Sequence, residues 1–431
     1  MSLQAMYSGV SGLQAETEAL STVGDNIANV NTNGFKSQRD VFEDVLGHSI
    51  MAGSQTAMPG SGVRVGAVQQ MFTQGTVTNT GVSTDLALNG DGSFVVKGAI
   101  DGVSGNFYSR DGAFNINAQG SIVNADGLQL QGYMANADGT FSTNVSSLQV
   151  PTTALQPHAS TSMTITANLD SSSVAPTAVF DPTNPGQTSN TSTSMTVFDS
   201  LGTAHTLNVY MTKTGANQWD YHVLANGAEM TPATTGNVEV GTGSFTFTSN
   251  GALDSVTTTT PIIVSFAGAT ANQAISLNVG TPITGAGGTG LDGITQFSSP
   301  SNVSSQSQDG YASGDFSGVS VDSSGTVEGL YTNGQKLAIG QLTIAKFQNN
   351  EGLGRTGSNM WIDTRDSGPP ALGTAGSGGR GAISAGSLEG SNVDLATEFV
   401  NLIQDQRSYS ADSKTITTAD QMLQELLQIK Q

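Results

Sequence analysis

Residues 2–30, SLQAMYSGVSGLQAETEALSTVGDNIANV, carry apolar side chains at the a and d spacing of a heptad repeat. These side chains belong to Leu3, Met6, Val10, Leu13, Leu20 and Ile27. This period predicts an amphipathic helix with one apolar seam. The helix should end near Asn31-Thr32-Asn33-Gly34, because Asn and Gly favour turns and a left-handed C-cap.

The other end of the chain repeats the pattern. Its apolar positions are Leu395, Phe399, Leu402, Tyr409, Ile416, Leu423 and Leu427. A closing helix is expected to begin near Asn392 or Asp394, either of which can cap it, and to run almost to Gln431. No helical pattern between the ends offers these seams a partner. We therefore expect the terminal helices to pack against each other and against neighbouring copies, as a coiled-coil-like inner domain. The alternative is that each helix packs on its own globular domain.

The long middle of the chain has the pattern of β-strands and turns. Short apolar runs alternate with Asn-Gly and Asp-Gly dipeptides, as on either side of Asn89-Gly90-Asp91-Gly92, which are hairpin signals. Near residues 151–157 the composition shifts to Thr, Ser, Ala, Asn and Gly, which predicts an inserted antiparallel β domain. The expected fold class is mainly β with terminal α-helices. The predicted parts are a terminal helical polymerisation domain (1–30 and 386–431), an extended connecting region (31–74 and 363–385), a split β domain (75–152 and 303–362) and the inserted outer β domain (153–302).

Charge and composition exclude several classes of function. The chain has 14 basic against 34 acidic residues, a formal net charge of -20, and no basic residue but Lys213 between Arg110 and Lys336. Nucleic acids and anionic membranes are bound by Lys and Arg, so neither partner is expected. Cysteine is absent, which excludes disulfides and thiol chemistry. No stretch approaches the roughly 20 apolar residues of a membrane span. No early apolar run resembles a signal peptide, so we expect a soluble chain that is exported, if at all, without a cleaved signal.

Catalytic and cofactor motifs are also missing. The histidines at 48, 158, 205 and 222 are scattered without metal-like spacing. Gly376-Ser-Gly378-Gly-Arg-Gly381 matches a dinucleotide-binding pattern, but no hydrophobic strand precedes it and no helix opens from it. Asn115 to Asp126 has the outline of a calcium loop, yet it lacks the closing Glu, so a hairpin turn explains it better. We expect no enzyme activity, cofactor or metal.

The motifs that border the two helices resemble a known family. Asn26-Ile-Ala-Asn29-Val-Asn31-Thr-Asn33-Gly34-Phe35-Lys36 follows the first helix, and Gly386-Ser-Leu388-Glu389-Gly-Ser391-Asn392-Val393-Asp394-Leu395 precedes the second. Tyr108-Ser-Arg110-Asp111-Gly112, with Phe114, lies between them. All three are similar to sequences of the axial proteins of the bacterial flagellum (rod, hook and hook-associated subunits). The motif positions expected to matter are Asn26, Asn29, Gly34, Phe35, Ser391, Asn392 and Asp394.

The resemblance implies a structural function. Rod subunits of this family carry little insert, whereas the long Thr/Ser-rich insert here is most similar to that of hook subunits. Those polymerise into a curved, flexible tube that couples rod to filament, transmits torque, and lies outside the cell after export by the flagellar type III apparatus. The implied partners are further copies of the chain, the distal rod, the hook cap, hook–filament junction proteins and the export apparatus. The alternatives are a distal rod or hook-associated subunit and, from another class, a secreted carbohydrate-binding or adhesive β protein, which would make no use of the terminal heptads.

Overall fold

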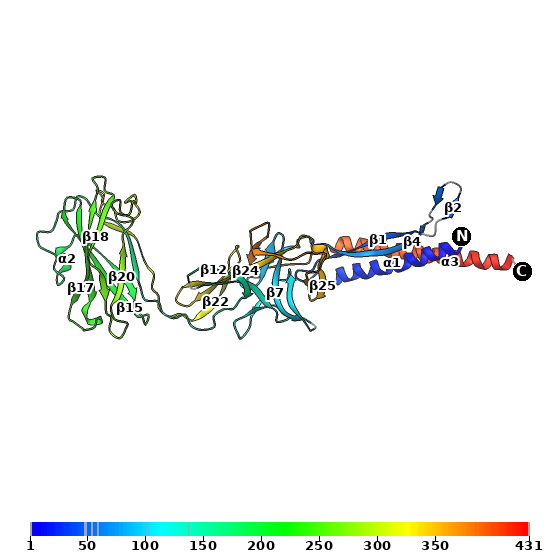
Figure 1. Ribbon diagram of the computed structural model, residues 1–431, viewed down its shortest axis with the longest axis horizontal. Helices are drawn as coiled ribbons and strands as arrows, with labels where there is room; N and C mark the ends of the chain where they lie inside the picture. The colour runs from blue at the N-terminus through cyan, green and yellow to red at the C-terminus, as the bar shows by residue number, and fades with distance from the viewer. Residues whose placement is uncertain are drawn as a thin grey trace. The chain divides into compact units, whose positions relative to one another are not determined.

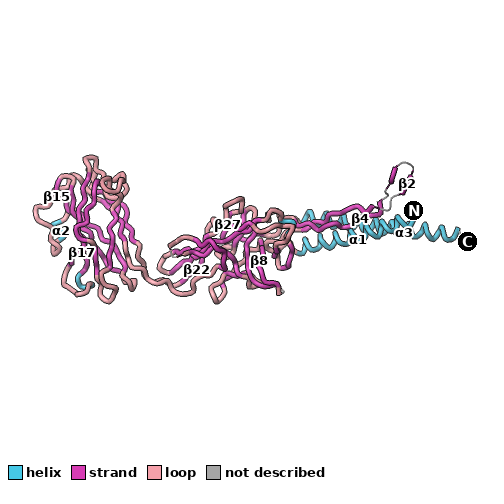
Figure 2. The backbone as a smooth tube through the Cα atoms, viewed as in Figure 1, coloured by secondary structure: helices cyan, strands magenta, loops and turns pink. Residues whose placement is uncertain are grey.

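The computed structural model describes residues 2–46, 50–52, 55–57, 60–100, 102–136 and 138–429. Two long helices lie at the ends of the described chain and strands occupy most of the rest (Figure 2), which confirms the expected fold class. The chain divides into two compact units. Unit 1 comprises Met1–Thr152, Gly318–Leu330 and Lys336–Gln431, and unit 2 comprises Thr153–Ser317 and Tyr331–Gln335. The four domain limits given above stay a prediction.

The terminal helices pack together in unit 1. Helix α1 (Ser2–Ala28) and helix α3 (Leu395–Ile429) lie side by side, and the hairpin of β1 (Gln38–Leu46) and β4 (Gly60–Gln70) runs along α1 (Figure 1). Strands β2 (Ile50–Ala52) and β3 (Gln55–Ala57) pair with each other. Both helices therefore belong to one helical layer, although 366 residues separate Ala28 from Leu395 in the sequence.

The face of α1 that is covered consists mostly of small residues. Gly9, Gly12, Ala15, Ala19 and Val23 are buried, at spacings of three and four residues. A Cβ added at Gly12 would collide with the carboxylate of Asp412, and one added at Gly9 would meet Ile416 at 2.9 Å. Because these positions carry little or no side chain, α3 can approach the backbone of α1 closely. Gly9 and Gly12 thus make part of the contact inside one chain, and the heptad pattern does not indicate these small residues.

The β part of unit 1 is built around one large, branched sheet. Its main path runs β22 (Phe316–Val321), β23 (Thr326–Tyr331), β24 (Lys336–Lys346), β11 (Gln129–Ala135), β7 (Ser93–Ile100), β8 (Val103–Ser109), β26 (Met360–Ile362) and β25 (Gly354–Gly357). Strands β9 (Asn115–Ile116), β10 (Ile122–Val123), β12 (Phe141–Ser147) and β27 (Ala371–Thr374) branch from it. Tyr108 and Phe347 meet edge to face in its core, with ring centroids 4.7 Å apart.

Two short strand pairs tie the C-terminal segment to the N-terminal half. Strand β28 (Ala382–Ala385) pairs with β6 (Leu86–Asn89), and β29 (Ser387–Glu389) pairs with β5 (Val77–Asn79), both antiparallel. The Gly-rich tract before β28 is a turn in which Gly376 N–H donates to Gly381 O at 3.0 Å. The Arg380 guanidinium donates to Ala371 O and Ser377 O in the same turn. These contacts bring the entrance of α3 to the β part of unit 1.

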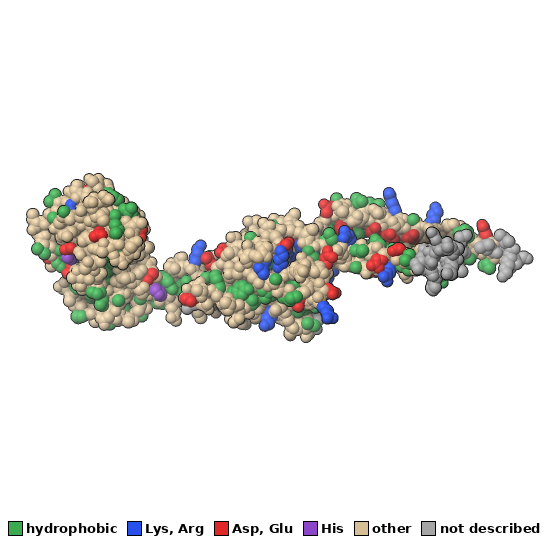
Figure 3. Space-filling view, turned by 45° about the horizontal axis from the view of Figure 1, so that its top comes forward, with side chains coloured by type: hydrophobic (Ala, Val, Ile, Leu, Met, Phe, Trp, Pro, Cys, Tyr) green, Lys and Arg blue, Asp and Glu red, His purple; other side chains and the backbone are tan. Residues whose placement is uncertain are grey.

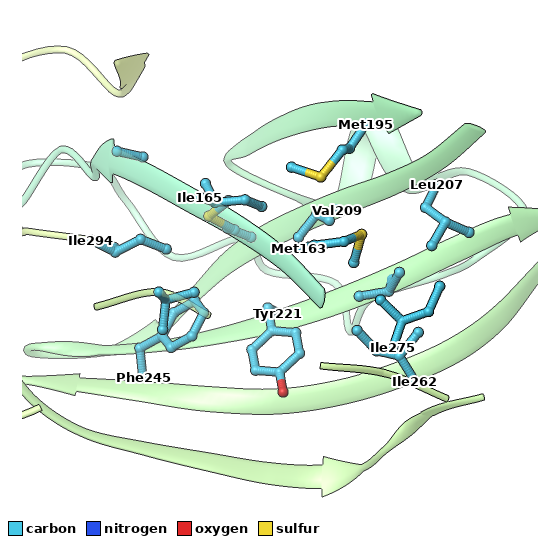
Figure 4. Packing of buried hydrophobic residues seen from close by; sticks show 14 of the residues in the cluster. Met163, Ile165, Met195, Leu207, Val209, Tyr221, Phe245, Ile262, Ile275 and Ile294 are labelled. Carbon is cyan, nitrogen blue, oxygen red and sulfur yellow. The ribbon is translucent and has the colours of Figure 1, made fainter. Parts of the chain in front are cut away.

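Unit 2 is a β-sandwich. One sheet is the meander β14 (Thr191–Phe198), β15 (Ala204–Gly215), β16 (Gln218–Asn226), β17 (Asn237–Phe247) and β18 (Leu253–Thr260). The other has the order β19 (Ile262–Val264), β20 (Gln273–Asn278), β13 (Ser162–Asn168) and β21 (Asn302–Gln308); α2 (Pro185–Thr188) is a single short turn. Figure 4 shows Met163 and Ile165 of the second sheet among Val209, Tyr221 and Phe245 of the first, in one shared core.

One strand pair departs from the expected antiparallel insert. Strands β13 and β20 are parallel, with Ser162 opposite Ser276 and Thr164 opposite Asn278. Parallel neighbours need a long connection, and here the connection from β13 to β20 includes the whole five-stranded meander. Every other named pairing in unit 2 is antiparallel among the described residues.

Candidate assembly site

Three motifs that lie far apart in the sequence meet at a buried ion-pair cluster in unit 1. The Lys36 Nζ lies 2.6 Å from Glu389 Oε1, and the Arg110 guanidinium lies 3.1 Å from Glu389 Oε2. The side chains of Lys36 and Glu389 are 0% exposed, and that of Arg110 is 7% exposed. We call Lys36, Arg110 and Glu389 the charge clasp. It joins the segment after α1, the β part of unit 1 and the segment before α3.

The remaining hydrogen-bonding groups of the charge clasp are also satisfied. Lys36 donates to Thr73 O at 2.7 Å, and Gly75 N–H donates to Glu389 Oε1 at 3.0 Å. Arg110 donates to Leu88 O at 3.1 Å and to Gly90 O at 2.6 Å. Burial lowers the pKa of the Lys36 ammonium, and the charge of Glu389 opposes that shift. A buried pair with all partners in place fixes one geometry, because any displacement leaves a charge uncompensated.

Gly34 and Phe35 form the tight turn beside the charge clasp. Gly34 has φ +67°, and its N–H donates to Glu389 O at 2.8 Å. A Cβ at this position would lie 2.5 Å from the backbone nitrogen of Asp111. Phe35 is buried, and the Arg355 guanidinium carbon lies 5.7 Å from the centre of its ring. The sequence motif therefore needs Gly at 34 both for the left-handed backbone and for the close approach of Asp111.

A Gly34→Ala substitution should destabilise unit 1 more than Gly127→Ala does. Both glycines have positive φ, +67° and +78°, but no atom lies within 4 Å of a Cβ added at Gly127. Gly127→Ala should cost the roughly 1–2 kcal/mol of a left-handed alanine. Gly34→Ala should cost more, because the Asp111 backbone must also move. Urea unfolding of both variants measures the difference, and equal losses would mean that the turn yields without strain.

Two amide side chains tie the helix ends to the hairpin strands. The buried Asn26 amide donates to Gln38 O at 2.8 Å and accepts from Gln38 N–H at 2.9 Å. Asn392 accepts from Ser37 N–H at 2.7 Å and donates to Met71 O at 2.7 Å. Each side-chain amide thus hydrogen-bonds to backbone groups at the end of a strand, as the backbone of a neighbouring strand would. The end of α1 and the start of α3 are held to the same pair of strands.

The other motif positions act locally. Asn29 donates to Asp25 O at 2.8 Å, which closes the last turn after α1, and Ser391 Oγ accepts from Val393 N–H at 3.3 Å. Asp394 accepts from Thr397 N–H at 3.0 Å, so it is Asp394, of the two predicted capping candidates, that caps α3. That hydrogen bond holds the pKa of Asp394 below its ordinary value.

The predicted seam residues are not fully covered within one chain. Met6, Leu13, Leu20, Ile27, Leu402, Ile416 and Leu423 are half-buried, and Val10, Leu395, Phe399, Tyr409 and Leu427 are exposed. The side chain of Leu3 lies outside the described part. The apolar seams are thus only partly covered within one chain, while Gly9 and Gly12 of the small-residue face of α1 lie against Ile416 and Asp412 of α3. The role of these side chains in assembly stays a prediction.

The three charge-clasp residues lie inside the sequence motifs, but the motifs do not by themselves predict them as site residues. A signal was present, since only 11% of the chain is charged and each of the three motifs carries one of these charges. Among the described residues, no group of three His, Cys, Asp or Glu side chains is arranged to hold a metal ion. None of the described helices has the length and apolarity required to cross a membrane.

Similarity to known protein families defines the class of protein to which the chain belongs. The chain matches the family descriptions "Flagella basal body rod protein" at residues 6–36, "Flagellar hook protein FlgE/F/G D1 domain" at 87–170, "Flagellar basal body protein FlaE D2 domain" at 168–311 and "Flagellar basal body rod FlgEFG protein C-terminal" at 384–429. These matches, which contain most of α1, all of α3 and the junction motifs, define an axial protein of the bacterial flagellum.

Similarity over the full length gives the family within that class. The chain is 36% identical to the flagellar hook protein FlgE of Salmonella typhimurium over 98% of both chains. It is 36% identical to that of Escherichia coli over 99% of this chain and 100% of the relative, and 32% identical to that of Borreliella burgdorferi over 99% and 100%. The chain belongs to the flagellar hook protein FlgE family. The crystal structure of Helicobacter pylori FlgE2 shares the fold, with a TM-score of 0.52 at 16% identity over 72% of this chain and 100% of that one.

Proposed function

We propose that this chain is a structural subunit of the flagellar hook, which polymerises through its terminal helices into a curved tube that couples rod to filament and transmits torque. Membership of a structural family indicates a function without catalysis. The observation that carries the proposal is that both terminal helices keep half-buried or exposed apolar residues after packing on each other, as at Val10, Phe399 and Tyr409. Burial of one large apolar side chain contributes roughly 1.5–3 kcal/mol, so repeated contacts of this kind between copies favour a polymer.

The charge clasp supports transmission of force between the layers. It connects both helix ends to the β part of unit 1 by buried ion pairs and backbone hydrogen bonds. A rigid connection of this kind would carry torque from the helical layer to the β part. The proposed partners are other copies, the distal rod, the hook cap, hook–filament junction proteins and the export apparatus. The proposed route to the cell exterior is flagellar export without a cleaved signal peptide.

Electron microscopy tests the proposal. The purified chain should form tubes, and a strain that lacks its gene should have an intact rod and no hook. A missing distal rod would instead favour the rod-subunit alternative, which the full-length similarity to hook proteins does not favour. A chain that stays monomeric at high concentration and binds glycans would favour the adhesive alternative.

A further inference from the structure

Partly buried carboxylates gather where α1, β1 and α3 meet. Asp40, Glu398 and Asp405 border a half-open cavity of about 360 Å³ between these elements. Burial raises the pKa of the Glu16 carboxyl on α1, and the nearby charges of Asp405 and Asp412 on α3 raise it further. We call these five residues, Glu16, Asp40, Glu398, Asp405 and Asp412, the acidic cleft. Figure 3 shows acidic side chains concentrated on this helical part of unit 1.

The negative charge of the acidic cleft has no counter-ion among the described residues. Over the described residues, the ion pairs involve other side chains, and none includes a member of the acidic cleft. Arg39 borders the cavity, but its guanidinium donates to Gln69. Glu16 Oε2 is buried without a hydrogen-bond partner. Burial, with Asp40 nearby, also raises the pKa of Asp405. Such a cleft gains free energy from any cation that enters it.

The opposite face of α3 carries cations beside exposed apolar side chains. Val400 and Ile403 are 63% and 50% exposed, and Arg407 and Lys414 are also exposed. Successive members of this set are three, four and seven residues apart. They therefore lie on one side of the helix and form a stripe along it. We call it the outer stripe. It is an unpartnered helix face in which the apolar part precedes the basic part.

The charges of the outer stripe and of the acidic cleft have the same axial spacing. Glu398 and Asp405, which border the cavity, are seven residues apart, as are Arg407 and Lys414, so both pairs are about 10.5 Å apart along the helix. The two pairs are offset by nine residues, about 180° around the axis. The cations of one α3 therefore point away from the acidic cleft of the same chain and cannot neutralise it. A second, parallel α3 presents both cations at the spacing that the carboxylates require.

We propose that the outer stripe of α3 in one copy docks along the acidic cleft of a second copy, where Arg407 and Lys414 neutralise its carboxylates. This inference rests on the proposed polymerisation and names the electrostatic contact that sets the register between neighbours. Val400 and Ile403 would be covered in the same contact, as in other recognition of an amphipathic helix by a groove. Complementary charges across an interface fix register and exclude wrong pairings.

A second copy fits the acidic cleft better than other cations do. The described residues contain no cluster arranged to hold a metal ion. The stripe has two basic residues in a chain of net charge -20, which is too little for an anionic surface to be its partner. The chain itself supplies both complementary surfaces. One copy can therefore use its outer stripe on one neighbour and its acidic cleft on another, which propagates a polymer.

Charge reversal with a matched control tests this contact. Arg407→Glu/Lys414→Glu should raise the critical concentration for tube formation by about tenfold or more, because like charges would then face each other across the contact. The control Lys97→Glu/Lys336→Glu makes the same change in net charge at exposed positions of the β part and should assemble as the wild type does. Adding Glu398→Lys/Asp405→Lys to the first variant should restore assembly, which would also demonstrate that the reversed chain folds. Critical concentrations come from sedimentation of purified chains.

The outcomes separate this contact from the proposed function. Normal assembly of Arg407→Glu/Lys414→Glu overturns the contact and leaves polymerisation intact. A loss that the control shares, or that reversal of the cleft does not repair, also overturns it, because net charge or another contact would then be responsible. Failure of the wild-type chain to form tubes under any condition instead contradicts the proposed polymerisation itself.

Discussion

Glu389→Ala should destabilise unit 1 by about 3–5 kcal/mol, because it leaves two buried cations without a counter-charge. Lys36 is completely buried and Arg110 is nearly so, and Glu389 provides a carboxylate oxygen to each, at 2.6 and 3.1 Å. Gly75 N–H would lose its acceptor as well. Since burial already lowers the pKa of Lys36 and Glu389 opposes that shift, removing Glu389 should push Lys36 further toward its neutral form.

An exposed ion pair in the same unit provides the control. Arg64 and Glu43 lie 2.9 Å apart with side chains 69% and 50% exposed. Glu43→Ala should therefore cost no more than about 1 kcal/mol. Urea unfolding followed by Trp361, which is buried in unit 1, measures both variants once Trp219 is replaced by Phe. If Glu389→Ala costs as little as Glu43→Ala does, the charge clasp does not hold the junction.

The charge clasp also illustrates what a sequence pattern cannot supply. Heptad spacing predicted both helices, and local chemistry predicted that Asp394 can cap α3, because each of these depends on residues a few positions apart. Lys36 and Glu389 are 353 residues apart, and Arg110 and Glu389 are 279 apart. A single charged residue inside a motif does not reveal its distant partner. Strand pairing far along the chain, β28 with β6 and β29 with β5, brings these segments together.

The packing of the two terminal helices against each other was predicted and is confirmed, but the residues of α1 that make this contact were not, for a different reason. A hydrophobic periodicity gives weight to Leu, Ile and Val, whereas the covered face of α1 contains one such residue, Val23, beside Gly9, Gly12, Ala15 and Ala19. Glycine in a helix normally indicates a weak helix, not an interface. The large apolar residues that define the heptads are the ones left half-buried or exposed. The pattern thus predicted the helices, while the small residues determine how closely they pack. The parallel pair β13–β20 was missed because its register depends on where a distant segment returns.

Removing residues 395–431 should abolish tube formation, while the β part of unit 1 and the β-sandwich of unit 2 stay folded. The deletion takes away α3, and with it the exposed apolar residues Phe399, Tyr409 and Leu427. It also uncovers the small-residue face of α1, and one isolated helix of this length is marginal in water. The charge clasp remains, because Glu389 precedes the deletion. We therefore expect a monomer by sedimentation, no tubes by electron microscopy, and unchanged fluorescence from Trp219 and Trp361.

Point substitutions distinguish the contribution of the apolar side chains of α3 to assembly from the contribution of the helix as a whole. Phe399→Ala/Tyr409→Ala removes two exposed rings, so it should leave the stability of the monomer almost unchanged and raise the critical concentration for assembly strongly. Gln404→Ala/Gln424→Ala, at exposed polar positions of the same helix, should have little effect on either quantity. Tubes formed by the chain without residues 395–431 would show that the terminal seams do not drive assembly. Assembly would then depend on the β parts, and the exposed apolar residues of α3 would need a partner other than a second copy.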